Sequence, residues 1–199
     1  MRNRSKRSLS RFIIRLSIGA TALSVAVMIC ATAFVNGFQH AIADKVFRFW
    51  GHIRVIQSID QGPGLMEEVP MEINPAVENT LQQTQGVQSV SPYATKSALL
   101  QTSGSLESIL FKGISTPAVF KRQQNFLQSG HWISFTDSLY SKEIMISIYT
   151  AKQLQVKTGD SLIVHFFRND GTKTARRLIV CGTYKTGIEE YDKNFGICD

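Results

Sequence analysis

Carboxylates gather at one place in this chain, near its C-terminal end, where Glu189, Glu190 and Asp192 lie close together. Such a group can hold a cation or a basic partner, but a solvated loop face has the same composition, and we favour the loop. Gly159-Asp160 is interpreted in the same way, as a turn closed by an Asx-type backbone bond. We expect no chemistry at either place.

The chain contains none of the motifs that mark common catalytic classes. A Gly-x-Ser-x-Gly elbow, a Walker A loop and a His-Glu-x-x-His helix are all missing. The histidines are scattered and are expected in turns or on the surface: His40, His52, His131 and His165. The sequence therefore predicts no catalytic, cofactor or metal site, and a protein that is not an enzyme.

The three cysteines say little about the redox compartment. Cys30 falls in an apolar run, while Cys181 and Cys198 lie far downstream. These two could form a disulfide or remain two buried thiols, and both alternatives stay open.

The N-terminal region predicts a membrane span. Six of the 22 cations and none of the 15 acids precede residue 16, so the rest of the chain is nearly neutral. The run 16–38 has no charged side chain, and its length of about 35 Å as a helix suffices to cross a bilayer core. Basic residues beside a span stay in the cytoplasm, which places residues after 38 on the far side. Nucleic-acid binding is not expected, because no basic stripe with aromatics follows.

Other interpretations of this run fit less well. A cleaved signal peptide has a shorter apolar core, and Ala31-Thr32-Ala33 is its sole candidate cleavage site. A buried core helix would not be apolar all round behind a cationic tail. Cys30 could indicate a lipoprotein anchor, but the bulky Met28-Ile29 before it does not suit lipoprotein processing.

The periodicity of the remaining chain predicts an α+β fold. Residues 39–50 continue the span as a helical stalk that Gly51-His52 ends, and a strand is expected from Ile53. A helix should start at Pro75, and a hairpin should turn at 103–105. Short strands with glycine turns follow in 115–185, as in a small barrel or sandwich. Residues 51–114 and 115–185 are thus expected to be separate subdomains.

Several motifs in this order resemble those of the lipoprotein-releasing (Lol-type) ABC transporter permeases, within the broader FtsX/MacB-like superfamily. The most specific are an Asn-Gly-Phe at the end of the span, a Gly-His at the end of the stalk, and a Thr-Gly-Ile-Glu-Glu-Tyr-Asp segment. The positions that carry them are Asn36, Gly37, Phe38, Gly51, His52, Gly187, Glu189, Glu190, Tyr191 and Asp192.

The resemblance implies a domain plan and a location. Residues 1–15 would be a cytoplasmic tail and 16–38 the first span of a permease in the bacterial inner membrane. Residues 51–114 would be the first half of a mixed α/β porter-like periplasmic part, 115–185 a β-rich insertion, and 186–199 a connection back. The chain stops at Asp199 without a second span, so we expect the N-terminal portion of a longer permease or a fragment.

The resemblance also implies a function. A cytoplasmic ATPase would bind ATP and Mg²⁺, a second permease copy or paralogue would complete a dimer, and lipoproteins would be the substrate, with a periplasmic carrier as a further partner. The apolar face of Phe38, Ile42, Val46 and Phe49 is expected either to meet the lipid-modified substrate or to pack on the second span. Alternatives are a MacB-type exporter, an FtsX-type cell-division regulator, and a single-span sensor or adhesion module.

Overall fold

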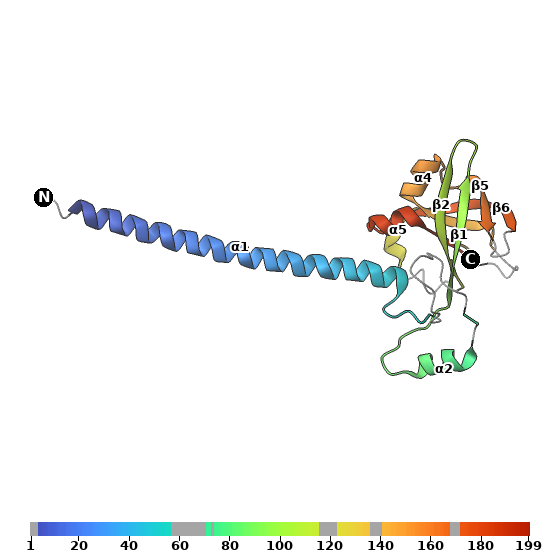
Figure 1. Cartoon of the computed structure of the whole chain (residues 1–199), viewed down its shortest axis with the longest axis horizontal. Coiled ribbons are helices and arrows are strands. Elements are labelled where there is room, and N and C mark those ends of the chain that lie inside the picture. Colours follow the sequence, from blue (N-terminus) through green and yellow to red (C-terminus); the bar gives the residue numbers. More distant parts are fainter. Residues whose placement is uncertain (1–3, 57–70, 73, 116–122, 136–140, 168–171) are drawn as a thin grey trace. The chain divides into compact units, whose positions relative to one another are not determined.

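The structure is a computed structural model that describes residues 4–56, 71–72, 74–115, 123–135, 141–167 and 172–199. The chain divides into two compact units, Met1–Phe47 and Arg48–Asp199. Helix α1 (Arg4–Trp50) forms the first unit, and its last residues, from Arg48 on, belong to the second unit (Figure 1). The expected continuity of span and stalk is therefore confirmed.

Helix α1 has the properties that a lipid environment demands. Its stretch Arg11–Trp50 is the one helix among the described residues that is long and apolar enough to cross a membrane. Hydroxyl groups within the apolar run donate to carbonyls of the preceding turn, as from Thr21 Oγ1 to Ser17 O at 2.9 Å and from Thr32 Oγ1 to Ile29 O at 2.9 Å. Polar side chains satisfied inside the helix cost little in hydrocarbon.

The second unit is built on one sheet of seven strands. In sheet order these are β3 (Leu127–Gly130), β6 (Lys173–Tyr184), β4 (Glu143–Ser147), β7 (Phe195–Cys198), β2 (Leu106–Ile114), β1 (Tyr93–Gln101) and β5 (Ser161–Phe167). Strand β5 also pairs with β6, so the strand pairings close into a ring with β3 added on the outside of β6. Closure is possible because β6 is long: its first part pairs with β5, and its last part with β4 and β3.

Short helices complete this unit. They are α2 (Pro75–Gln83), the 3₁₀ turn η1 (Gln124–Phe126), α4 (Ile148–Leu154) and α5 (Glu189–Asn194). Asn74 caps α2, its side chain accepting from the Ala76 amide at 3.0 Å, and Pro75 occupies the first turn as predicted. Ser147 caps α4 by accepting from the Thr150 amide at 3.0 Å. Helices α4 and α5 lie side by side (Figure 1).

Strand β4 is buried on both faces of the sheet, which its alternation makes plain. Ile144 and Ile146 belong to one apolar cluster together with Ala151 and Leu154 of α4. Met145, between them, points to the opposite face and joins a second cluster, which includes Phe49 from the end of α1. Successive strand residues face opposite sides, so β4 needs a core on each side. The end of α1 supplies part of the second core.

The sheet differs from the expected division at residue 114. Strands β1 and β2 from the first predicted range lie in the same sheet as β3 to β6 from the second. The sequence predicted most of these strands and the hairpin of β1 with β2, which is confirmed. It did not predict that β5 lies against β1 or that β7 pairs with β2 and β4. Hydrogen bonding between distant segments makes Arg48–Asp199 one compact unit.

One local prediction was wrong, and another lacked detail. The residues from Ile53 to Ile56 form no strand and are exposed, whereas Ile59 lies outside the described residues. The C-terminal stretch 186–199, expected as a connection back toward the porter-like part, contains helix α5 and strand β7, and β7 pairs with β2 of the first predicted range. Four residues are too few for a strand period to be recognised. The sequence Arg168-Asn169-Asp170-Gly171, which predicts a hairpin turn, lies outside the described residues.

Candidate functional site

Two of the three motifs of the chain, the Gly-His at 51–52 and the segment 186–192, come together at the C-terminal end of α1. Its last residues belong to the second unit, and the helix stops because Gly51 adopts φ 91°, a left-handed conformation that glycine reaches without strain. At such an end, the last carbonyl groups have no partner within the helix and need donors from elsewhere. Here two side chains of the sheet domain supply them.

Lys112 on β2 and Gln123 just before η1 are the two donors. The Lys112 ammonium donates to the Phe49 carbonyl, and Gln123 Nε2 donates to the Arg48 carbonyl at 3.0 Å. The two side chains are 5% and 1% exposed, so water competes little for either bond. A positive charge at a helix C-terminus also interacts favourably with the helix dipole.

Aromatic rings surround the Lys112 ammonium. The nitrogen lies 4.4 Å from the ring centre of Trp50, 4.9 Å from that of Phe49 and 5.6 Å from that of Tyr93. A cation within about 6 Å of a ring face is attracted to it, more strongly when water is excluded. Three rings and a helix carbonyl thus offset the cost of burying this charge.

The segment 186–195 packs on the same helix end. The Tyr191 ring stacks on Phe49 with centres 4.9 Å apart and planes at 20°, and the Phe195 ring meets Trp50 edge-on at 5.2 Å. The Tyr184 hydroxyl donates to the Phe195 carbonyl at 2.7 Å. Burial, followed by the charge of Asp192, raises the pKa of Tyr184, so this hydroxyl stays protonated.

We call this set the helix anchor: Phe49, Trp50, Tyr93, Lys112, Gln123, Tyr184, Tyr191 and Phe195.

Asp192 gives the neighbouring segment its shape. Its carboxylate accepts from the Thr186 amide at 2.8 Å, the Thr186 hydroxyl at 2.9 Å and the Gly187 amide at 3.1 Å. Its own carbonyl accepts from the buried Ser147 hydroxyl. The predicted solvated loop is therefore wrong for Asp192, which is 9% exposed and fixes the turn that presents Tyr191.

The other two carboxylates of that group are exposed, as predicted. Glu189 and Glu190 lie in the first turn of α5, where negative charge suits the helix dipole. The ion pair with Lys193, one turn along, lowers the pKa of Glu189.

The four residues of the predicted substrate face differ in their exposure. Phe38 is exposed, Ile42 and Val46 are half-buried, and Phe49 is 1% exposed within the core of the second unit. Including Phe49 in an exposed lipid-facing surface was therefore wrong, because the domain covers this ring. Of the remaining motif positions, Asn36 and Gly37 are exposed on α1, Gly51 ends the helix, and His52 is exposed just beyond it.

Sequence reasoning missed the two most important donors. Neither Lys112 nor Gln123 lies in a motif that predicts contact with a helix end. A lysine beside Phe111 in an alternating strand is normally assigned to the solvent face. The sequence offers one indication that the end of the stalk is covered: it ends in Phe49-Trp50, an aromatic pair suited to burial.

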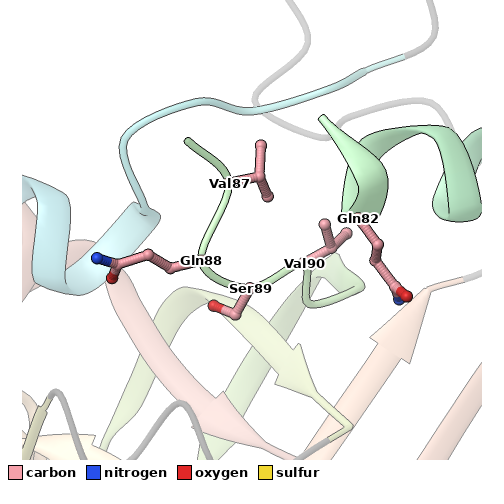
Figure 2. A pocket seen from close by; sticks show the side chains of 5 residues that line it. All are labelled: Gln82, Val87, Gln88, Ser89 and Val90. Atoms are coloured by element: carbon pink, nitrogen blue, oxygen red, sulfur yellow. The ribbon is translucent and has the colours of Figure 1, made fainter. Parts of the chain in front are cut away.

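A hollow lies apart from the anchor, between α2 and the segment that follows it. Its lining residues are Gln82, Val87, Gln88, Ser89 and Val90 (Figure 2). These side chains are neutral, so the hollow has no charged group for catalysis or ion binding, and we assign it no function.

The fold and the anchor define an α+β domain joined to the end of a helix suited to span a membrane. The chain belongs to the family of the MacB-like periplasmic core domain, whose model matches residues 16–197. The resemblance inferred from the motifs is thereby confirmed.

Two curated relatives agree with this assignment. The lipoprotein-releasing system transmembrane protein LolE of Haemophilus influenzae is 25% identical over 85% of this chain and 39% of its own length. The corresponding protein LolC of Neisseria meningitidis serogroup B is 21% identical over 99% of this chain and 46% of its own length. The chain thus spans less than half of either relative.

A solved structure, the extracellular domain of the noncanonical ABC-type transporter YknZ from Gram-positive bacteria, is 20% identical. It covers 63% of this chain and 62% of its own, with a TM-score of 0.42.

Proposed function

We propose that this chain forms part of an inner-membrane permease subunit that detaches lipoproteins for transfer to the outer membrane. A partner ATPase binds and hydrolyses ATP in the cytoplasm, and helix α1 carries the resulting movement to the periplasmic domain. The basic tail keeps the N-terminus cytoplasmic. A second permease copy or paralogue completes the transporter, and a periplasmic carrier receives the lipoprotein. The names of the two relatives support the choice of substrate.

The helix anchor is the observation that carries the mechanical part of this proposal. A helix transmits movement to a domain only if the contacts at its end contribute more free energy than the transition places on them. One hydrogen bond to a charged donor contributes about 1.5–3 kcal/mol, and a desolvated cation–π contact about 2 kcal/mol. Coupling between sites in allosteric proteins is typically about 1–3 kcal/mol. The contacts of Lys112 with the Phe49 carbonyl and the Trp50 ring are of the same size as such a coupling, which supports a joint that stays intact during the transition.

The stalk itself is suited to transmission. Residues 39–50 contain neither proline nor glycine, the usual sites of kinks, and α1 runs through them without a break. Rigid-body movement of one element against another is a common way in which transporters and switches change state.

Inserting Gly-Gly after Ala43 in the full-length permease, assembled with its partners, tests this proposal. We expect ATP hydrolysis to continue and lipoprotein release from proteoliposomes to fall at least tenfold, because the stalk bends instead of moving the domain. An Ala-Ala insertion at the same place rotates the helix equally but leaves it stiff, and should retain more release. The same Gly-Gly insertion in the exposed turn after Ser103 should have little effect. Unchanged release after the insertion at Ala43 would contradict the lever.

We further propose that Phe38, Ile42 and Val46 form the surface that meets the lipid-modified substrate. They share one apolar side of the helix where bilayer gives way to water. A photo-crosslinking residue placed at each should capture lipoprotein in membranes, whereas one at Asp44 should not. Crosslinks to permease alone would instead identify this side as a packing surface for another span.

A further inference from the structure

Three side chains with metal-binding atoms meet on the second unit. His131 follows β3, Glu143 begins β4 and Cys181 lies on β6. Their ligand atoms all lie within 4.8 Å of one another, which no other group of three or more such side chains achieves in the described part of the chain. No motif of metal-ligand spacing predicts this cluster, since the three residues come from different strands.

The backbone brings these residues together by an unusually close approach. The His131 amide donates to the Cys181 carbonyl at 3.1 Å. A Cβ at Gly130 would lie 2.1 Å from that carbonyl oxygen, and a Cβ at Gly182 would lie 2.5 Å from the His131 carbonyl oxygen. Two glycines are thus required for the strands to place His131 beside Cys181.

We propose that His131, Glu143 and Cys181 bind a divalent zinc-type ion. Imidazole nitrogen, carboxylate oxygen and thiolate sulfur are the ligands that Zn²⁺ takes, whereas Ca²⁺ and Mg²⁺ prefer oxygen alone. Three protein ligands leave the fourth tetrahedral position to water.

The distances suit such an ion. Two ligands on one tetrahedral Zn²⁺ lie about 3.3–3.6 Å apart, given bond lengths of about 2.0–2.3 Å. His131 Nε2 and Glu143 Oε1 are already 3.2 Å apart. The three ligand atoms lie within 4.8 Å of one another, so the imidazole and the thiol must approach by about 1 Å to share one ion. The His131 side chain can make this movement because it is 60% exposed.

The surroundings orient two of the ligands. The second oxygen of Glu143 accepts from the Ser134 amide at 2.8 Å, which leaves Oε1 toward His131. The Cys181 thiol, 2% exposed, donates to the Ile144 carbonyl at 3.3 Å, and the ion would replace that proton. Outer contacts of this kind hold metal ligands in position. A bound ion would fasten β3, β4 and β6 to one another.

Titration of the full chain in detergent with Co²⁺ alone, followed by Zn²⁺ alone, tests the site. We expect one equivalent of Co²⁺ to bind with a thiolate-to-cobalt charge-transfer absorption, and Zn²⁺ to displace it. Cys181→Ala should abolish the absorption, and His131→Gln and Glu143→Gln should each weaken affinity at least tenfold. Cys198→Ala, which removes the other thiol of the second unit, should leave both unchanged.

Two outcomes would overturn the proposal. One is the absence of the charge-transfer absorption in the wild-type chain, or its persistence in Cys181→Ala. The other is unchanged affinity in His131→Gln. If Cys181→Ala fails to fold, His131→Gln decides alone, because the His131 side chain is largely exposed and its replacement leaves the core intact.

Discussion

Lys112 joins the sheet to the last turn of α1 through one hydrogen bond and three aromatic rings. Replacing it with methionine keeps the length of the side chain but removes the donor and the charge. We expect Lys112→Met to lower the free energy of unfolding by about 1–3 kcal/mol, because the buried Phe49 carbonyl loses its charged donor. Urea denaturation of the full chain in detergent measures the change.

Lys152 provides the matched control. It lies exposed on α4, so Lys152→Met should change stability by less than about 0.5 kcal/mol. A stability equal to or above that of wild type in Lys112→Met would mean that the cost of burying the ammonium exceeds the value of its contacts.

The thiols of Cys181 and Cys198 give a prediction about pH. Both are free, and burial, helped by a nearby carboxylate, raises the pKa of each to about 12. At about pH 8 only about one such thiol in ten thousand is ionised, and the thiolate is the reactive form. In a Cys30→Ala background, iodoacetamide should label neither thiol in the folded chain, and both once urea unfolds it.

The direction of the pH effect follows from the raised pKa. Labelling of the folded chain should rise about tenfold for each pH unit, for as long as pH stays below the folded pKa. Labelling of the native protein at neutral pH as fast as that of the unfolded chain would show that these thiols are exposed.

The backbone of helix α1 turns away from the helix at one glycine. Gly51 has φ 91°, and a Cβ there would meet only the Ile53 carbonyl oxygen, at an ordinary 3.9 Å. Gly51→Ala should therefore cost about 1–2 kcal/mol through backbone strain alone, not through a clash. Gly104→Ala in the β1–β2 turn has no such φ and nothing within 4 Å, so it should be nearly neutral. Thermal unfolding compares the two, and equal midpoints would contradict the capping role.

The strand pairings have a consequence for the whole second unit. Because β1 and β5 pair directly and the ring closes through β6, the ranges 51–114 and 115–185 should unfold together. Leu100→Ala removes a fully buried side chain of β1 and should lower stability by about 2–5 kcal/mol.

Hydrogen exchange followed by mass spectrometry distinguishes one cooperative unit from two. The protection of amides in β6 should fall as much as that in β1 when Leu100 is replaced, and the exposed Leu106→Ala should affect neither. Loss of protection confined to 93–114 would restore the two-subdomain prediction.

The sequence by itself determined the local features of this protein and its family. The unbroken apolar run predicted α1 and its candidacy as a membrane span. The turn at 103–105 separates β1 from β2, and the turn at Gly159-Asp160 precedes β5. The Asn-Gly-Phe, Gly-His and Thr-Gly-Ile-Glu-Glu-Tyr-Asp motifs indicated the family that the model of the periplasmic core domain confirms. These features are encoded in neighbouring residues, so periodicity and turn chemistry reveal them.

Only the tertiary structure decided which of these segments meet. Alternation shows that Lys112 and Phe111 face opposite sides, but not that the end of α1 covers the lysine. Spacing did not reveal that Tyr191 stacks on Phe49, that Asp192 is buried, or that His131, Glu143 and Cys181 share one spot. Contacts between residues far apart in the chain depend on the pairing of strands, and the pattern within one strand does not specify its partner.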